Sequence, residues 1–375
     1  MRFEQRAVKP TEASIVHVRT ATGGYDVHFG FGVLAGLASL LEAHANAHHY
    51  AIISDTNVVR LHAEPLHHQL SGAGISATVF PFEAGEANKT RETWADVTDR
   101  MLAAGIGRDG CVIGVGGGVT GDLAGFVAAT YMRGIALVTV PTTLLAMIDA
   151  SIGGKTGVDT RAGKNLIGAF HPPRLVITDA ATLETLPEAE FTAGLAEAVK
   201  HGAIADAQYL AWLEAETSRI LGRDPSAIQT LIRRSIEIKA DFVADDEREE
   251  GRRAALNFGH TIGHAIERLT DYRLSHGSAI SVGMVAEAKL GEAIGRTAPG
   301  TARSIERALR AFGLETGMPA GITIPDLVRA TASDKKAAEG RVRYALVANP
   351  GRMAQAGGDW THPVSFEQVV SALEG

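Results

Sequence analysis

The chain has 375 residues, of which 45% are hydrophobic and 21% are charged, and its 36 basic and 43 acidic residues give a net charge of −7. This balance is typical of a globular protein with a large core, and it excludes the basic blocks that favour nucleic acid or an anionic membrane. A single cysteine, Cys111, excludes an intrachain disulfide and a thiolate metal cluster. We expect a cytoplasmic protein, because residues 1–14 lack a signal-like apolar segment and no run approaches the ~20 apolar residues of a membrane span.

Strand and helix patterns alternate over the first half of the chain. The predicted strands are residues 14–20, 25–30, 50–55, 77–82, 111–115 and 135–141, and the predicted helices are 32–45, 56–70 and 92–106. This alternation predicts a mainly parallel sheet with helices on both faces, in which Cys111 is buried and inert. Ligands of such sheets bind beyond the carboxyl ends of the strands.

Helical patterns dominate from Pro187, a residue that can open a helix at its first turn. They cover residues 187–206, 207–221, 227–247, 254–269 and 278–294, and a clear strand pattern returns at 342–348. We therefore predict two domains: an α/β, Rossmann-like nucleotide-binding domain over residues 1–186 and an all-α domain over residues 187–375.

A glycine-rich run follows the predicted strand 111–115. Residues 116–121 read GGGVTG and match G-x-G-x-x-G, a pattern that lets backbone N–H groups approach a pyrophosphate. A purely structural glycine turn explains the run about equally well. The next strand ends in Thr142 and Thr143 without the usual acidic residue, so Asp55 is the candidate for a ribose contact. The turn 84–90 is either part of this site or a solvated loop.

Residues 148–173 are too polar and glycine-rich for a plain core, and we expect an irregular loop beyond the strand ends. Asp149 and Asn165 lie in it, together with Lys155 and Lys164, whose ammonium groups could bind phosphate. The alternative is a solvated surface loop.

The stretch 253–277 has the spacing of a metal site. If it is helical, Arg253, Asn257, His260 and His264 share one face, and His276 follows after a short polar break. The alternative is a set of hydrogen-bonded core or surface histidines. Glycines at 259 and 263 would each cost ~1 kcal/mol inside a helix, so we expect close approach of a neighbouring helix or a ligand.

Taken together, these stretches resemble the 3-dehydroquinate synthase family. The matching runs are GGGVTGDLAGFVAATYMRG, PTTLLAMIDASIGGKTGVD, GKNLIGAFHPP, TLPEAEFTAGLAEAVKHG, DDEREEGRRAALNFGHTIGHAIE, HGSA and DKKAAEGRVRYAL, in family order. The resemblance implies an NAD- and metal-dependent lyase of the shikimate pathway. Such an enzyme converts 3-deoxy-D-arabino-heptulosonate 7-phosphate to 3-dehydroquinate and phosphate. It oxidises the substrate transiently, eliminates phosphate, returns the hydride and closes the ring by an internal aldol reaction.

The resemblance also implies roles for individual residues. The metal ligands, for one zinc or cobalt ion, are Glu197, His260 and His276, and His264 lies beside the substrate instead of on the metal. The catalytic residues are Lys155, His264, Lys200, Asp149 and Asn165. The substrate contacts are Arg133, Lys239, Arg253, Asn257, Lys335 and Lys336. The NAD contacts are Asp55, Gly85, Glu86, Lys89, Gly118, Val119, Thr120, Gly121, Asp122, Thr142, Thr143, Lys155, Lys164, Thr182, Leu183, Glu184 and Thr185. Ser278 departs from the family, which has Glu there, and a partner of the metal ligands is expected to be lost.

Three alternatives stay open. A cyclase for sedoheptulose 7-phosphate would share NAD, metal and most of the site, but its substrate has no carboxylate for Arg253, Lys239 and Asn257. A metal- and NAD-dependent alcohol dehydrogenase would not need Lys155, Asn165 and Lys200, and it would release NADH. A protein that only binds nucleotide would not keep this polar set. We expect a small sugar acid phosphate as partner, no nucleic acid or membrane, and a homodimer.

Overall fold

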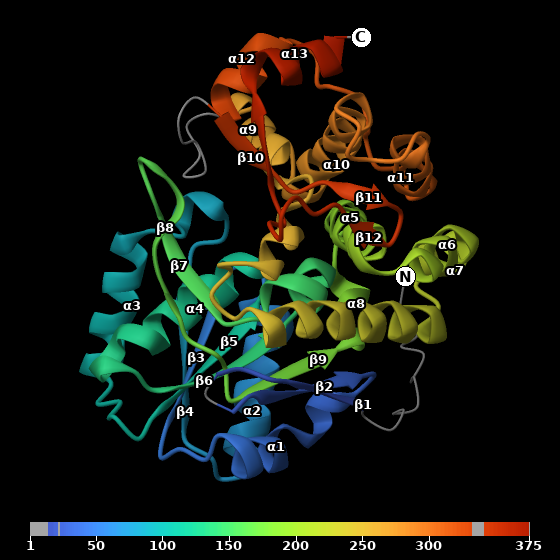
Figure 1. Cartoon of the computed structure of the whole chain (residues 1–375). Coiled ribbons are helices and arrows are strands. Elements are labelled where there is room, and N and C mark those ends of the chain that lie inside the picture. The colour runs from blue at the N-terminus through green and yellow to red at the C-terminus, as the bar shows by residue number, and fades with distance from the viewer. Residues whose placement is uncertain (1–13, 22, 332–340, 375) are drawn as a thin grey trace. The chain divides into compact units, whose positions relative to one another are not determined.

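The protein divides into two compact units, residues 1–187 and 188–375. Its structure, a computed structural model, describes residues 14–21, 23–331 and 341–374 (Figure 1). Lys335 and Lys336, two expected substrate contacts, lie outside the described residues. None of the helices in these ranges is both long and apolar enough to cross a membrane.

The first unit is built on a seven-stranded sheet with the order β1-β2-β9-β6-β5-β3-β4. β1 pairs antiparallel with β2, and the other neighbouring strands are parallel, which confirms the mainly parallel sheet. The bounds are β1 Ser14–Val18, β2 Tyr25–Gly30, β3 Tyr50–Asp55, β4 Ala77–Phe82, β5 Cys111–Gly116, β6 Ala136–Pro141 and β9 Leu175–Asp179. From β3 the chain places β4 on one side and β5 on the other, so the strand order reverses between β3 and β5.

Helices cover both faces of this sheet (Figure 1). Ile52 and Ile113 face the core under α1 and α2, whereas Ile53 and Val112 face the core under α3 and α4. Successive residues of one strand point to opposite faces, and both faces are covered, so β3 and β5 are buried throughout. Burial raises the pKa of the Cys111 thiol in β5 to about 12, as expected of an inert cysteine. The helix bounds are α1 Leu37–His44, α2 Glu64–Gly72, α3 Arg91–Ala103 and α4 Gly118–Thr130.

The second unit is mostly helical. Its helices are α5 Glu188–Ala205, α6 Ala207–Ala215, α7 Thr217–Leu221, α8 Pro225–Asp245, α9 His260–Leu269, α10 His276–Ala293, α11 Thr301–Ala311, α12 Ile324–Thr331 and α13 Phe366–Glu374. The strand pattern near the end forms two short antiparallel ladders, which the description as all-α leaves out. They pair β10 (Arg341–Tyr344) with β13 (His362–Ser365), and β11 (Val347–Asn349) with β12 (Arg352–Met353).

Helices α9 and α10 pack closely because glycines line their contact. A Cβ on Gly263 would lie 2.5 Å from Ile280 Cδ1, and one on Gly259 would lie 2.9 Å from the backbone nitrogen of Met284. Close approach of a helix therefore accounts for both glycines. Gly259 also has a left-handed φ of 81° at the N-cap of α9, so it ends the preceding turn. The predicted continuous helix over residues 254–269 is wrong, because a 3-10 turn (η7, Arg252–Asn257) precedes Gly259.

Candidate active site

A hydrogen bond joins the ends of β3 and β5, where the strand order reverses. Asp55 is the last residue of β3, and Thr120 lies in the first turn of α4, which follows β5. Thr120 Oγ1 donates to Asp55 Oδ2 at 2.9 Å, and the Asn57 amide donates to Oδ1 at 3.0 Å. Open α/β sheets bind ligands at such reversal points, beyond the carboxyl ends of the strands. The glycine run thus lies where this fold favours a ligand.

Other side chains pack against the first two glycines of the run 116–121, whereas the space beside its last glycine is open. A Cβ on Gly116 would lie 2.5 Å from Thr120 Oγ1, and one on Gly117 would lie 3.1 Å from Thr143 Cγ2. A Cβ on Gly121 would meet no atom of the described residues within 4 Å. The first N–H groups of a helix such as α4 have no partner within the helix and favour an anion. A structural turn explains Gly116 and Gly117, while the open space at Gly121 fits a bound phosphate.

Lys89 lies in a cluster of carboxylates. Its Nζ is 2.9 Å from Glu86 Oε1, 3.2 Å from Asp122 Oδ2 and 3.5 Å from Asp159 Oδ1. Burial lowers the pKa of Lys89, but the three carboxylates outweigh it and raise that pKa above its usual value. Lys164 Nζ adds a contact of 3.4 Å to Glu86. The residues of the 84–90 turn thus belong to an ion network, which orients Glu86 and Asp122.

The other residues of the expected nucleotide site also follow parallel strands. Thr142 and Thr143 follow β6, and residues 182–185 lie in a 3-10 turn after β9 (η6, Ala180–Thr185). Leu183 is buried with its side chain in the protein interior, so only its backbone is suited to a ligand contact. The structure places at this edge Asp55, Gly85, Glu86, Gly118, Val119, Thr120, Gly121, Asp122, Thr142, Thr143, Thr182, Glu184 and Thr185.

The polar run after β6 forms a hairpin, so the expected irregular loop is wrong. β7 (Lys155–Thr160) pairs antiparallel with β8 (Gly163–Phe170) after a π-helical turn, η5 (Ala146–Ala150), that contains Asp149. A Cβ on Gly168 would lie 2.2 Å from the Thr156 carbonyl oxygen, so the glycines that hid the strand pattern let the two strands pair. Asn165 has a positive φ of 52°, and its backbone N–H donates to Asp159 Oδ1 at 2.8 Å. Lys155 and Asn165 are both exposed on this hairpin.

Arg133 does not join the carboxyl edge of the sheet within its own unit. It follows the C-terminal end of α4, whereas the glycine run lies at the N-terminal end of that helix. The 13 residues of α4 span about 20 Å. Arg133 is exposed there, with a left-handed φ of 69°. The first unit therefore does not bring this expected substrate contact to Gly118 or Thr120.

In the second unit, three donors from three helices converge. Glu197 lies in the middle of α5, His260 is the first residue of α9, and His276 is the first residue of α10. The Nε2 atoms of both histidines lie 3.5 Å from Glu197 Oε1. Two ligands at about 2.0–2.1 Å from a tetrahedral ion are about 3.3–3.4 Å apart. The spacing and the buried carboxylate therefore fit one divalent metal ion.

A partner of Nδ1 orients each of these two imidazoles. His260 Nδ1 lies 3.2 Å from the Phe258 carbonyl oxygen, and His276 Nδ1 lies 3.5 Å from Glu267 Oε1. An acceptor at Nδ1 keeps the proton on that nitrogen and leaves the lone pair of Nε2 for an ion. Glu267 is buried, and its role as the partner of His276 could not be predicted from spacing, because the two residues lie in different helices.

Burial and neighbouring charges both shift the pKa values of the residues in this site. Burial raises the pKa of Glu197, but the Lys200 ammonium, which contacts its Oε2, and the two histidines outweigh burial and hold the pKa well below its usual range. Burial lowers the pKa of His276, yet Glu197 and Glu267 raise it to about 9. Burial and Lys200 together lower the pKa of His260. Without an ion, a proton on His276 supplies part of the positive charge that a metal would otherwise supply.

His264 lies at the exposed side of this cluster. Its ring centroid is 5.3 Å from that of His260 and 5.9 Å from that of His276, and its Nε2 is 3.9 Å from Glu267 Oε2. His264, Glu267 and His276 form an alternative set of converging donors. The Glu197 set fits an ion better, because its carboxylate meets both imidazoles at one oxygen.

Arg253 and Asn257 do not continue the histidine face, because η7 and Gly259 separate them from α9. Arg253 is buried, its backbone N–H donates to Asp246 Oδ2 at 2.9 Å, and its Nη1 donates to the Glu247 carbonyl oxygen at 2.5 Å. Asn257 Nδ2 donates to Glu249. Arg253 therefore lies inside the protein and supports the 246–257 loop from there.

One further glutamate supports the start of α9. Glu287 in α10 is fully buried and accepts from the Gly259 amide at 2.7 Å and the Ile262 amide at 3.0 Å, so it caps the helix that begins with His260. A lone Glu in the apolar run GMVAEA was the available signal for it.

Ser278 lies in the first turn of α10, where its amide donates to the N-cap Ser275. A Glu at 278 would extend that cap, so Ser278 removes a capping partner, and Glu267 still meets His276.

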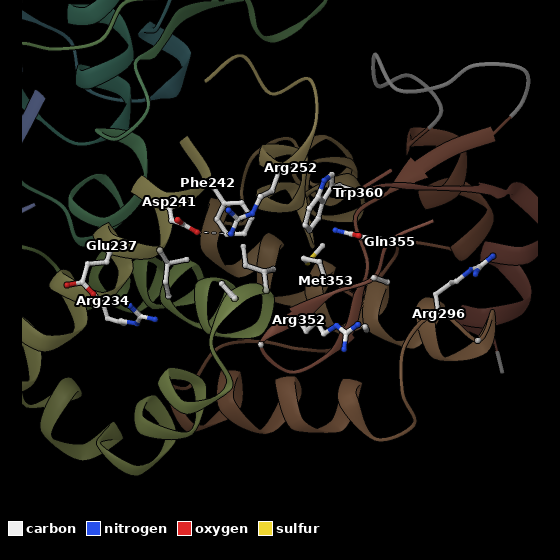
Figure 2. A pocket seen from close by; sticks show the side chains of 17 residues that line it. Arg234, Glu237, Asp241, Phe242, Arg252, Arg296, Arg352, Met353, Gln355 and Trp360 are labelled. Atoms are coloured by element: carbon white, nitrogen blue, oxygen red, sulfur yellow. Dashed lines mark hydrogen bonds and ion pairs between the residues drawn. The ribbon is translucent and has the colours of Figure 1, made fainter. Parts of the chain in front are cut away.

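A pocket of about 940 Å³ in the second unit is separate from these residues (Figure 2). It is lined by the end of α5, by α8, by Arg252 and by residues between 295 and 360, and none of the expected site residues that the structure describes lies among them. Arg252 Nη2 lies 2.7 Å from Asp241 Oδ2 there, and Arg234 Nη1 lies 3.0 Å from Glu237 Oε2. Acidic neighbours thus already balance two of its arginines, and the pocket is not the candidate active site. Lys239, an expected substrate contact, is buried in the same helix α8.

Solved structures of similar proteins share the fold. A 2-deoxy-scyllo-inosose synthase complexed with carbaglucose-6-phosphate, NAD⁺ and Co²⁺ matches with a TM-score of 0.88 and 28% identity, covering 96% of this chain and 100% of that one. A 2-epi-5-epi-valiolone synthase from Streptomyces hygroscopicus with NAD⁺ and Zn²⁺ bound matches with a TM-score of 0.83 and 30% identity, covering 93% and 96%. A probable glycerol dehydrogenase from Sinorhizobium meliloti, at 16% identity and a TM-score of 0.66, shares the fold alone.

Sequence comparisons are more specific. Residues 79–193 match the 3-dehydroquinate synthase N-terminal family, and residues 194–337 match the 3-dehydroquinate synthase C-terminal family. The 3-dehydroquinate synthase of Symbiobacterium thermophilum is 43% identical over 88% of this chain and 92% of its own length. That of Xylella fastidiosa strain M23 is 44% identical over 90% of this chain and 93% of its own length. The chain belongs to the 3-dehydroquinate synthase family.

Proposed function

We propose that this chain converts 3-deoxy-D-arabino-heptulosonate 7-phosphate to 3-dehydroquinate and phosphate, as a lyase of the shikimate pathway. The observation that supports it most is the convergence of Glu197, His260 and His276 beside Lys200, in a chain 43–44% identical to 3-dehydroquinate synthases. The assay follows phosphate release from the heptulosonate phosphate while absorbance reports NADH. Phosphate release that requires NAD, without net NADH, is the expected result. Accumulation of one NADH per product would instead indicate a dehydrogenase.

Two bound groups are part of the proposal. When bound, NAD supplies a reversible hydride acceptor and the divalent metal a Lewis acid. Glu197, His260 and His276 would hold the metal, zinc or cobalt, with Glu267 fixing the His276 ring. The first-turn amides of α4, with Asp55 and the open space at Gly121, would hold the dinucleotide.

The remaining polar residues would act on the substrate. Lys200 lies against Glu197, so it would place a positive charge beside the metal site. His264 is partly exposed at the edge of the cluster and is suited to move a proton between substrate and solvent. We assign phosphate binding to Lys155 and Asn165 and carboxylate binding to Lys239, Arg253 and Asn257.

A second candidate function is cyclisation of a sugar phosphate without a carboxylate, such as sedoheptulose 7-phosphate. The likeness to 2-deoxy-scyllo-inosose synthase and 2-epi-5-epi-valiolone synthase supports it, at 28–30% identity. The higher identity to 3-dehydroquinate synthases favours the first proposal. Parallel assays with both substrates separate the two functions, because kcat/KM should favour the heptulosonate phosphate.

We further propose that the protein acts in the cytoplasm as a homodimer. Light scattering during size-exclusion chromatography tests the oligomeric state, and twice the chain mass of 39.4 kDa is expected. A single-chain mass at micromolar concentration would contradict the dimer.

A further inference from the structure

A second group of metal-type donors lies in the first unit, away from all the residues assigned above. Asp26 and His28 are two residues apart on β2, so both point to the same face of the sheet. His28 is level with Ile177 of β9, which belongs to the core under α1. The last residue of α1 is His44, which reaches the same place from above the sheet. Strand and helix thus bring two imidazoles and a carboxylate together.

The two imidazoles have the arrangement of the pair in the candidate active site. The ring centroids of His28 and His44 are 5.3 Å apart at an interplanar angle of 74°. Those of His260 and His276 are 5.4 Å apart at 64°. One ligand atom from each of Asp26, His28 and His44 lies within 4.8 Å of the others, so small side-chain rotations bring all three onto one ion. Matched ring geometry at two unrelated places suggests a shared kind of ligand.

His28 supplies an independent observation. Its side chain is buried, with 8% of the residue exposed, and among the described residues no partner hydrogen-bonds to its Nε2. Buried polar atoms of proteins nearly always have a partner, and an imidazole nitrogen without one is suited to a metal. His17, opposite Asp26 on β1, places Nδ1 2.8 Å from Asp26 Oδ1. A ligating carboxylate commonly has such a hydrogen-bonding neighbour.

We infer that Asp26, His28 and His44 form a second binding site for a divalent transition metal of the zinc class. Two imidazoles with one carboxylate suit Zn²⁺, Co²⁺ or Ni²⁺, whereas Mg²⁺ and Ca²⁺ prefer oxygen donors. Three protein ligands leave a fourth position for water. Because the ion would bridge β2 and the end of α1, it would fasten the helix to the edge of the sheet. The site shares no residue with the proposed catalytic metal site, so either can exist without the other.

Metal counting tests the inference. Chelator-treated, refilled full-length protein is dialysed against a low concentration of free Zn²⁺, and bound zinc per chain is measured by mass spectrometry. Wild type should retain two ions, Glu197→Gln should retain one, and Glu197→Gln combined with His44→Ala should retain none. His48→Ala is the matched control, because this exposed histidine four residues further on lies outside the donor set. His17→Ala should weaken the second ion by about tenfold.

A second measurement protects the test from misfolding of a variant. In the Glu197→Gln background, Zn²⁺ should raise the melting temperature, and His44→Ala should abolish that rise while circular dichroism of the metal-free protein stays unchanged. One ion per wild-type chain that Glu197→Gln removes, or a second ion that His44→Ala and Asp26→Asn both leave in place, would overturn the inference; one ion that Glu197→Gln leaves and His44→Ala removes would support it and contradict the proposed catalytic site.

Discussion

Replacing Glu267 with glutamine tests how the candidate metal centre is built. Glu267 Oε1 lies 3.5 Å from His276 Nδ1, and the side chain is buried. Glutamine keeps the size and an acceptor oxygen but removes the negative charge behind the imidazole. A metal bound at Nε2 accepts an electron pair from the imidazole, and a negative carboxylate at Nδ1 makes the ring a stronger donor. Glu267→Gln should therefore weaken metal binding while leaving Glu197, His260 and His276 in place.

The magnitude follows from two opposing effects. Loss of such an outer partner commonly lowers metal affinity by about 10–100-fold, or about 1.4–2.8 kcal/mol. Glu267 also raises the pKa of His276, so its removal relieves competition from the proton on that ring. Because the divalent ion carries twice the charge of a proton, the missing carboxylate weakens binding of the ion more than binding of the proton. We therefore expect the lower end of the range, about tenfold at neutral pH.

Competition of the apoprotein with a chromophoric zinc chelator measures this change. Glu292→Gln is the control, because Glu292 is a carboxylate of α10, the helix that begins with His276, and it accepts from the Ala302 amide instead of contacting His276 Nδ1. It should leave the zinc Kd unchanged. Phosphate release by Glu267→Gln should recover when zinc is raised above the new Kd. A zinc Kd within twofold of wild type would refute the reasoning.

Further predictions follow from the same contacts. Chelation should abolish phosphate release and zinc or cobalt should restore it, whereas full activity of metal-free protein would contradict the proposed metal. Metal-free protein should lose stability from about pH 6.5 to 9, because the pKa of His276 is raised to about 9 on folding and the stabilising proton leaves as pH rises through it; thermal melts should show this slope for wild type and a smaller one for His276→Gln. Lys89→Met should lower the free energy of unfolding by about 3–5 kcal/mol in urea titrations, since it removes the buried ammonium that contacts all three carboxylates. Lys164→Met should cost about 1 kcal/mol or less, because Lys164 is more exposed and its ion pair is with Glu86.

Six of the seven strands of the sheet could be predicted from the sequence, because their signal is local. Buried parallel strands such as β3 and β5 are short apolar runs between glycines and helices. The sequence did not predict β9, which lies between β2 and β6, because its apolar run, Leu175–Ile177, is only three residues long. The β7–β8 hairpin escaped prediction because its glycines and lysines conceal the alternation of a strand. Its pairing depends on Gly168, where a Cβ would meet the Thr156 carbonyl oxygen, and this requirement comes from the facing strand and not from the local sequence.

The metal centre shows the limit of spacing arguments. Spacing alone favours His260 and His264 as a ligand pair, since they are four residues apart on one helix. In the structure His276 is the imidazole that joins His260 at Glu197 Oε1, from another helix. Glu197 is 63 residues before His260, so only a family resemblance could propose the set. Gly259, with its left-handed φ, turns the chain so that His260 starts a helix at all.

Arg253 shows why the placement of a charge matters more than its presence. If Arg253 lay on the same helix face as the histidines, its guanidinium would have no other role in the protein. Its removal would then affect substrate binding alone. In the structure its Nη1 and backbone N–H both hold the 246–257 loop, through Glu247 and Asp246. Removal of a buried arginine with such bonds costs stability as well as affinity. A fall in kcat/KM of Arg253→Ala is therefore not enough to identify a carboxylate contact. The comparison of substrates does that, because loss of a carboxylate contact should lower kcat/KM for the heptulosonate phosphate more than for sedoheptulose 7-phosphate, whereas a disordered loop should lower both equally.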